Sequence, residues 1–181
     1  MMNDEKVQSK VSGRKAGPAD EVQLPGWNLD ELNYPTFRMT LIAKIMDRLT
    51  IRNLAEIEDI TYAEWRVMAR LATMHQGGTV RQVAEMAWVD RAEVSRAVST
   101  LEEKGYTLRL ENPHDRRAPI LKMTAVGLER YRAALAERKA FHELLTAKLS
   151  DKECETLNQL LAKIGEQLVV LSQPVATDAV K

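Results

Sequence analysis

Cysteine, histidine and long apolar runs are scarce in this sequence of 181 residues. The single cysteine, Cys154, excludes an intramolecular disulfide and fits a reducing compartment. Three scattered histidines provide no cluster from which a zinc site could form. No apolar run approaches the roughly 18 to 20 residues of a membrane span, and the N-terminal segment lacks an apolar secretion core. We therefore expect a cytoplasmic protein without a membrane segment or a metal site.

Aromatic residues and net charge are also in short supply. Only two Phe, three Trp and four Tyr occur, whereas Leu, Ala, Met and Glu are plentiful, which favours helices over sheets. Basic and acidic residues number 26 each, so any binding to nucleic acid must depend on local charge. The sequence shows no Gly-rich phosphate loop, no paired nucleophile and base, and no metal-spaced ligand set, so an enzyme is the weakest interpretation.

The segment from Thr79 to Met123 is the most informative part of the sequence. It predicts a short helix, a tight turn, a longer helix over Asp90–Lys104, and two strands, Tyr106–Leu110 and Ile120–Met123, joined by a polar loop. A helix-turn-helix followed by a basic hairpin is a device for reading duplex DNA, with one helix in the major groove and the hairpin beside it.

Capping boxes and glycines predict where the helices begin and end. Four segments match the capping-box pattern: Thr61–Glu64, Thr79–Gln82, Asp90–Glu93 and Ser150–Glu153. Gly77-Gly78 is expected to end a helix over Tyr62–His75, and Gly105 to end the Asp90–Lys104 helix, both as left-handed caps. Thr124 is expected to cap a helix that runs to Leu149.

The two ends of the chain predict long helices with wide apolar faces, which a second copy of the chain would cover. We therefore predict a mainly α homodimer, a winged helix-turn-helix whose N- and C-terminal helices form a dimerisation lobe. Its DNA-binding domain would occupy residues 59–123, between an N-terminal segment and dimerisation helix at 25–58 and C-terminal dimerisation helices at 124–173. Residues 1–24 are expected to form a disordered tail, and 174–181 a second tail.

The Asp90–Lys104 helix combines an apolar face with a face of arginines and short hydroxyl side chains. The apolar positions are Ala92, Val94, Ala97, Val98 and Leu101. The predicted DNA-binding positions are Arg91, Ser95, Arg96 and Ser99. Arginine can bind guanine O6 and N7 together, whereas serine is tolerant of sequence. The alternative is a solvated helix face of mixed charge.

The polar loop of the hairpin carries the second predicted DNA contact. Arg116 and Arg117 suit a narrow minor groove, whose negative potential attracts guanidinium groups. Asp115 is expected to orient one of them through a charge-assisted hydrogen bond. Seven basic and five acidic residues lie between Arg91 and Lys122, a net charge of +2. Affinity should therefore need a dimer that doubles these contacts.

Several motifs in this region carry a family resemblance. They are Val94-Ser95-Arg96, Leu101-Glu102-Glu103-Lys104-Gly105, Asn112-Pro113-His114-Asp115-Arg116-Arg117, and Lys122-Met123-Thr124 with Gly127. Together they resemble the MarR/SlyA family of winged-helix regulators, over roughly Phe37 to Leu171. The resemblance implies a homodimer on a pseudo-palindromic operator, most often a repressor released by a ligand. It also implies Ser95 and Arg96 in the major groove, Arg117 in the minor groove, and Asp115 bracing the wing.

The sequence departs from the family pattern at three positions. Trp88 occupies a turn where members often have small residues, Leu110 replaces a second arginine of the first strand, and Pro119 in the returning strand suits only an edge. Trp88 is expected to alter the angle of the following helix.

The resemblance implies a small aromatic or other anionic effector, and no cofactor. The predicted cleft would be lined by Ile45, Met46, Leu49, Trp65 and Met68, with Arg66 or His75 supplying charge. Plain core packing is the alternative for each of these residues. A different class of function, a dimeric adaptor whose winged domain binds a protein, is kept open by the neutral net charge.

Overall fold

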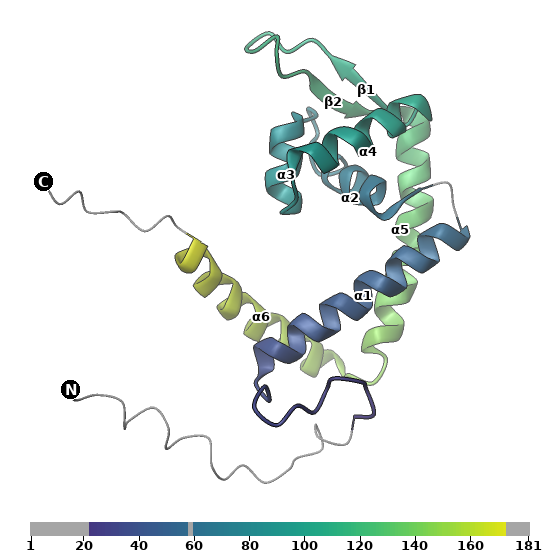
Figure 1. Ribbon diagram of the computed structural model, residues 1–181. Coiled ribbons are helices and arrows are strands. Elements are labelled where there is room, and N and C mark those ends of the chain that lie inside the picture. Colours follow the sequence, from purple (N-terminus) through teal and green to yellow (C-terminus); the bar gives the residue numbers. More distant parts are fainter. Residues whose placement is uncertain (1–21, 58–59, 173–181) are drawn as a thin grey trace, which may run out of the picture. The chain divides into compact units, whose positions relative to one another are not determined.

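The computed structural model describes residues 22–57 and 60–172 (Figure 1). The chain falls into two compact units, divided between Tyr62 and Ala63. The predicted tails at 1–24 and 174–181 lie outside the described residues, apart from residues 22–24. The expected domain boundary at residue 58 lies outside them as well, so the division into domains stays a prediction. None of the helices in the described ranges is long and apolar enough to span a bilayer.

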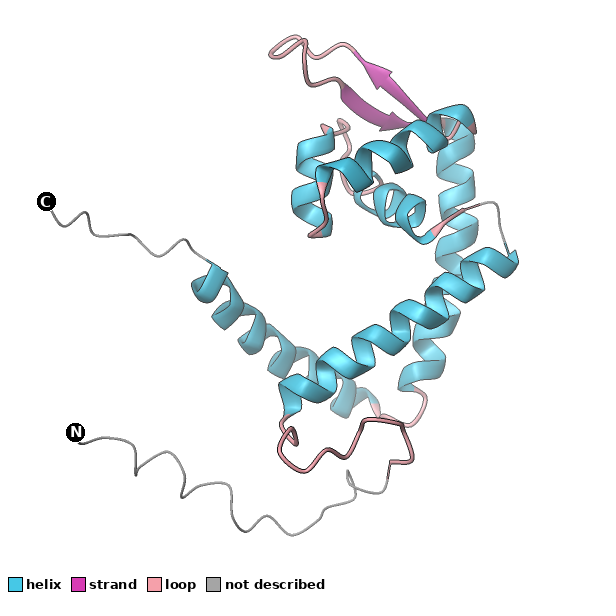
Figure 2. Ribbon diagram, in the orientation of Figure 1, coloured by secondary structure: helices cyan, strands magenta, loops and turns pink. Residues whose placement is uncertain are grey.

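Six helices and a two-stranded hairpin make up the described chain (Figure 2). In chain order they are α1 (Pro35–Ile57), α2 (Tyr62–Leu71), α3 (Val80–Ala87), α4 (Arg91–Glu103), β1 (Thr107–Leu110), β2 (Ile120–Met123), α5 (Ala125–Thr146) and α6 (Asp151–Ser172). The predicted mainly α fold with a β-hairpin wing is therefore confirmed.

The first unit consists of a turn-rich segment followed by α1. Two backbone hydrogen bonds close the turns, from Trp27 N to Leu24 O and from Leu32 N to Leu29 O. The guanidinium carbon of Arg38 lies 5.0 Å from the centre of the Trp27 ring, so the indole fixes its own segment to the first turn of α1.

The core of the second unit is built from one face of each helix of the helix-turn-helix region. Its buried apolar residues are Val67, Met68, Leu71, Val83, Ala84, Val94, Ala97, Val98, Leu101 and Leu121. Four of the five apolar positions predicted for α4 are thus confirmed, but Ala92 is exposed. The reason is helical periodicity, because Ala92 lies two residues before Val94 and so faces the opposite side of the helix.

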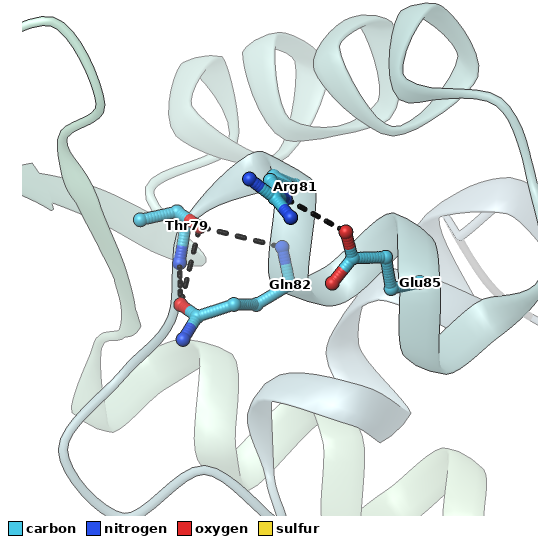
Figure 3. Close-up of polar contacts among 4 residues, drawn as sticks. All are labelled: Thr79, Arg81, Gln82 and Glu85. Atoms are coloured by element: carbon cyan, nitrogen blue, oxygen red, sulfur yellow. Dashed lines mark hydrogen bonds and ion pairs between the residues drawn. The ribbon is translucent and has the colours of Figure 1, made fainter.

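Capping boxes begin two of the helices as predicted. At α3, Gln82 N donates to Thr79 Oγ1 and Thr79 N donates to Gln82 Oε1 (Figure 3). Ser150 and Glu153 make the same reciprocal pair before α6. Thr124 caps α5 by accepting a hydrogen bond from the backbone N–H of Gly127. That helix ends at Thr146, three residues before the predicted end.

The capping box predicted at Asp90 is wrong. Asp90 does precede α4, but its side chain makes no cap hydrogen bond. The Glu93 carboxylate pairs instead with the guanidinium of Arg66 on α2. An ion pair between two helices thus takes the acid that a local box would need.

The two predicted glycine stops have different outcomes. Gly105 follows α4 with φ +72° and donates its backbone N–H to Glu102 O, the expected left-handed end. The stop at Gly77 is wrong, because α2 already ends at Leu71. Gly77 has φ +81° for another reason: a Cβ there would lie 2.4 Å from the carbonyl oxygen of Leu121. The glycine therefore allows the chain to approach β2 closely.

The hairpin follows the predicted pairing. β1 and β2 are antiparallel, with Thr107 opposite Met123 and Leu110 opposite Ile120. Pro119 lies just before β2 rather than within it, so its missing N–H removes no bond from the ladder. An isolated bridge joins Gly78, two residues before α3, to the hairpin, since Gly78 and Leu121 exchange backbone hydrogen bonds of 3.1 and 2.8 Å.

Candidate nucleic-acid interface

Helix α4 presents an exposed face of arginines and hydroxyl groups. Arg91, Arg96 and Ser99 are exposed, and Ser95 is half-buried. Ser99 Oγ donates to the carbonyl oxygen of Ser95 at 3.1 Å. Among the described residues, neither Arg91 nor Arg96 forms an ion pair. The structure thus brings the four predicted residues of α4 onto one accessible helix.

Helix α2 fixes the position of the N-terminal end of α4. Besides the Arg66–Glu93 ion pair, Arg70 Nε donates to the carbonyl oxygen of Met86 near the end of α3 at 3.0 Å. Two arginines of one helix therefore hold the two helices that flank the turn. This arrangement limits how far α4 can tilt relative to α3.

Two ion pairs hold the C-terminal end of α4 and the base of the hairpin. Lys104 Nζ lies 3.0 Å from Oε2 of Glu64, and Glu64 is buried. Arg109 Nε lies 2.9 Å from both carboxylate oxygens of Glu102. These contacts neutralise two of the seven basic residues counted between Arg91 and Lys122, so those two add little to a positive surface.

The wing loop between the strands is closed by side-chain to backbone hydrogen bonds. Asn112 is buried, donates from Nδ2 to Ala118 O at 2.8 Å, and accepts from His114 N at 3.0 Å. Asp115 Oδ1 accepts from the backbone N–H of Arg117 at 2.9 Å. Asp115 therefore braces the loop through the backbone, rather than through an arginine side chain as expected. The role of Asn112 was missed, although Asn-Pro is a recognisable turn signal.

The two arginines of the wing tip differ in their surroundings. Arg116 Nε lies 3.5 Å from Oε1 of Glu111, although both side chains are well exposed. Arg117 is exposed and has no ion-pair partner within the described part of the chain. Arg117 is therefore the wing cation that a phosphate or a groove can reach without competition.

The first turn of α3 lies beside the wing loop, with Arg81 and Glu85 on the exposed side of the helix. Arg81 Nε donates to Glu85 Oε1 at 2.7 Å, which raises the pKa of Arg81 above its ordinary value (Figure 3). A shallow cleft here is lined by Gly78, Thr79, Arg81, Asn112 and Asp115, among others. The wing and the helix-turn-helix therefore form one continuous surface.

The turn between α3 and α4 is made by Trp88 in an unusual conformation. Its φ of 54° and ψ of 45° lie in the left-handed region, and it is 85% exposed. In the described part of the chain it is the only residue other than glycine with positive φ. The expected change in the angle of α4 stays a prediction.

The predicted effector residues fall on both units. Ile45, Met46 and Leu49 lie half-buried on α1. In the second unit, Met68 is fully buried, Trp65 stacks on Tyr131 at 5.5 Å between ring centres, and Arg66 pairs with Glu93. His75 is exposed in the turn after α2. The cleft that would join these residues stays a prediction.

Sequence comparisons place this architecture among known proteins. Residues 58–118 match the model of the MarR family. The Multiple antibiotic resistance protein MarR of Escherichia coli (strain K12) is 31% identical over 124 residues, covering 65% of this chain and 81% of that protein. The chain belongs to the MarR family. YdcH, an HTH-type transcriptional regulator of Bacillus subtilis (strain 168), is 31% identical over 104 residues, covering 56% of this chain and 70% of that protein.

Solved structures of MarR proteins share the fold. A mutant MarR from E. coli complexed with operator DNA has a TM-score of 0.64 and 27% identity, covering 74% of this chain and 95% of that chain. The transcriptional regulator SlyA has a TM-score of 0.65 at 22% identity, covering 75% and 94%. The predicted resemblance is confirmed, and this MarR-family chain is a winged-helix transcriptional regulator.

Proposed function

We propose that this regulator binds a pseudo-palindromic DNA operator as a homodimer and represses transcription until a small ligand releases it. The observation that carries the DNA contact is the distribution of ion pairs on the winged domain. Arg91, Arg96 and Arg117 lie exposed without an acidic partner in the described chain, whereas Lys104 and Arg109 are paired with acids. A MarR structure with the same fold is complexed with operator DNA, which supports DNA as the partner.

Helix α4 would read bases in the major groove. A recognition helix contacts base edges through its N-terminal residues, which here include Arg91, Ser95 and Arg96. Arg96 can bind guanine in a bidentate manner, and Ser95 and Ser99 are short enough to allow a close approach. Arg117 at the wing tip would enter the adjacent minor groove, with its loop held by Asn112 and Asp115.

The homodimer is supported by the apolar surface of the C-terminal helices. None of the side chains of α6 is buried in the single chain. Its exposed apolar residues include Leu157, Leu160, Leu161, Leu168 and Leu171. Contiguous exposed apolar residues often mark a contact with another protein, and a second copy would cover these. The two half-sites of the operator would then lie about 10 bp apart, one helical turn.

Ligand release would act through Arg66. A small aromatic or anionic compound would bind in the cleft predicted from Ile45, Met46, Leu49 and Trp65, with Arg66 or His75 near its charge. Arg66 already holds Glu93 at the start of α4. An anion that competes for Arg66 would therefore weaken one of the contacts that position the DNA-reading helix.

The first experiment selects DNA bound by the wild-type protein from a random pool and measures its affinity for Arg117→Ala and Arg116→Ala. The two arginines are neighbours and carry the same charge, but among the described residues only Arg116 has an acidic partner. We expect Arg117→Ala to weaken binding by about tenfold or more, and Arg116→Ala to have a small effect. Equal binding by Arg117→Ala and the wild type would show that the wing assignment is wrong.

Base reading is tested separately. Arg96→Ala should change the selected sequence, whereas Lys122→Ala should weaken binding to all sequences alike. Equal and uniform losses from both variants would contradict the role of Arg96. Repeating the measurement with a panel of aromatic acids tests the effector, because a true effector lowers the affinity for DNA at a concentration that saturates the protein.

A further inference from the structure

The side chain of Trp88 is stabilised little by packing against the rest of the domain. Its residue is 85% exposed, the highest value among the exposed large apolar residues of the described chain. Backbone hydrogen bonds close the turn without the side chain: Trp88 N donates to Glu85 O, and Val89 N donates to Ala84 O. Glycine or asparagine would make the same left-handed turn with less strain. An indole here therefore gives the isolated domain no packing to offset its strain.

The position of Trp88 relates it to the DNA-reading helix. It lies two residues before Asp90, the cap of α4, and three before Arg91. Recognition helices contact bases through their N-terminal residues, so a side chain in the preceding turn would lie next to the same groove. Three acids lie around the indole: Asp90 is exposed, whereas the carboxylates of Glu85 and Glu93 are engaged by Arg81 and Arg66. These two acids thus repel phosphates less than their number suggests.

We propose that Trp88 contacts the operator DNA. Its indole would pack against apolar groups of the groove wall, beside the bases read by α4. The proposal rests on the proposed function. Duplex DNA offers an indole two uncharged partners in the groove wall, the 5-methyl group of thymine and the deoxyribose. Continuity with Arg91 and Arg96 favours DNA over a protein partner. The exposed leucines of the second unit lie mainly on α5 and α6, which is the surface proposed to bind the second copy, and not around Trp88.

The test compares Trp88→Gly and Trp88→Asn with Trp88→Phe on a duplex selected from a random pool by the wild-type protein. Gly and Asn both accept the left-handed backbone, so these variants should unfold thermally at or above the wild-type temperature. We expect each to lose about tenfold in affinity, and Trp88→Phe to keep most of it. Val126→Ala removes exposed apolar surface from the first turn of α5 and serves as the control, with unchanged affinity.

Salt dependence separates an apolar contact from an altered helix position. Burying an indole displaces no counterions, so Trp88→Gly should lower affinity equally at all salt concentrations and leave the slope of log K against log salt unchanged. A slope change like that of Arg117→Ala would mean that the variant displaces the cationic surface, which overturns the proposal. Replacing thymines with deoxyuridine should weaken the wild type at one position or more but leave Trp88→Gly unaffected there.

The outcomes distinguish this proposal from the proposed function. If the wild type selects no DNA, both fail. If the wild type selects DNA and Arg117→Ala loses it, while Trp88→Gly binds like the wild type, only the role of Trp88 is overturned. A Trp88→Gly variant that changes oligomeric state would assign the indole to a contact between copies of the chain and would also overturn it.

Discussion

The ammonium group of Lys104 lies 3.0 Å from the carboxylate of Glu64, and the Glu64 side chain is only 2% exposed. The pair joins the residue that ends α4 to the first turn of α2, 40 residues earlier in the chain. A carboxylate buried to this extent is costly unless a cation accompanies it. The ion pair therefore fixes one end of α4, while Arg66 fixes the other through Glu93.

Lys104→Met should destabilise the domain because it removes a cation that lies beside the buried Glu64 carboxylate. We expect a loss of about 3 kcal/mol in the free energy of unfolding, measured by urea titration at a fixed protein concentration. Arg109→Met is the matched control, since the Arg109–Glu102 pair is more exposed and should cost about 1 kcal/mol or less. Adding Glu64→Gln to Lys104→Met should recover part of the loss. Equal losses from Lys104→Met and Arg109→Met would contradict a structural role for the buried pair.

Gly127→Ala should disturb the junction between the hairpin and α5. A Cβ at Gly127 would lie 2.0 Å from the backbone carbonyl oxygen of Tyr106, and a backbone atom has little freedom to move away. We expect a destabilisation of about 2 to 3 kcal/mol by thermal or urea unfolding. Val126→Ala, one residue earlier and exposed, should be close to neutral. If Gly127→Ala were as stable as Val126→Ala, α5 could not pack on the hairpin as described.

Local signals explain how much of this fold could be predicted from the sequence. Thr79 with Gln82 and Thr124 with Gly127 are capping pairs formed within one turn of helix, and each appears in the structure as predicted. The hairpin strands were also recognisable, because a polar loop with turn residues separates two short apolar runs. Contacts within a few residues of each other depend little on the rest of the chain.

Two of the errors arise from contacts between residues that are distant in the sequence. Glu93 pairs with Arg66, 27 residues away, instead of forming the predicted capping box. Gly77 allows a close approach to Leu121 instead of ending α2. On the candidate DNA surface, too, local features were predicted and contacts between side chains were not. The arginines of α4 and the wing were predicted, but which of them are neutralised depends on acids such as Glu102 and Glu111, whose side-chain positions the sequence pattern does not reveal.

Asn112→Ala should loosen the wing without unfolding the domain. The buried amide makes two hydrogen bonds that close the loop, to Ala118 O and from His114 N. We expect faster amide hydrogen exchange in residues 113–118 and a loss of about 1 to 2 kcal/mol in stability. Affinity for operator DNA should also fall, because Arg117 is carried by this loop. Pro113→Ala, an exposed change in the same loop, is the control, and equal exchange in both variants would deny Asn112 its bracing role.

The start of α6 should respond to acid through Glu153. Hydrogen bonds from the backbone N–H and hydroxyl of Ser150 lower the pKa of Glu153 below its ordinary value of 4.5. A carboxyl group with a lowered folded-state pKa contributes stability above pH 4.5, and this contribution is lost as the pH falls through the folded-state pKa. The melting temperature of the wild type should therefore exceed that of Glu153→Gln at pH 7, and the difference should shrink below pH 4.5. A difference that stays constant down to pH 2 would contradict this role of the Ser150 contact.

Leu168→Glu should dissociate the proposed dimer. Leu168 is 59% exposed on the apolar stripe of α6, and a carboxylate placed there could not be covered by a second copy without losing its hydration. Gln159→Glu adds the same charge on the opposite side of the same helix, so it should remain dimeric. Light scattering after size-exclusion chromatography at micromolar concentration measures the mass of each variant.

The same two variants connect assembly to DNA binding. One winged domain carries a net charge of only +2 between Arg91 and Lys122, and ion pairs neutralise part of its basic residues. A monomeric Leu168→Glu protein should therefore bind a single half-site far more weakly than the dimer binds both, and its salt dependence should be about half as steep. A monomeric variant that retained both the affinity and the salt slope of the wild type would show that one winged domain suffices, and the homodimer would then have no part in recognition.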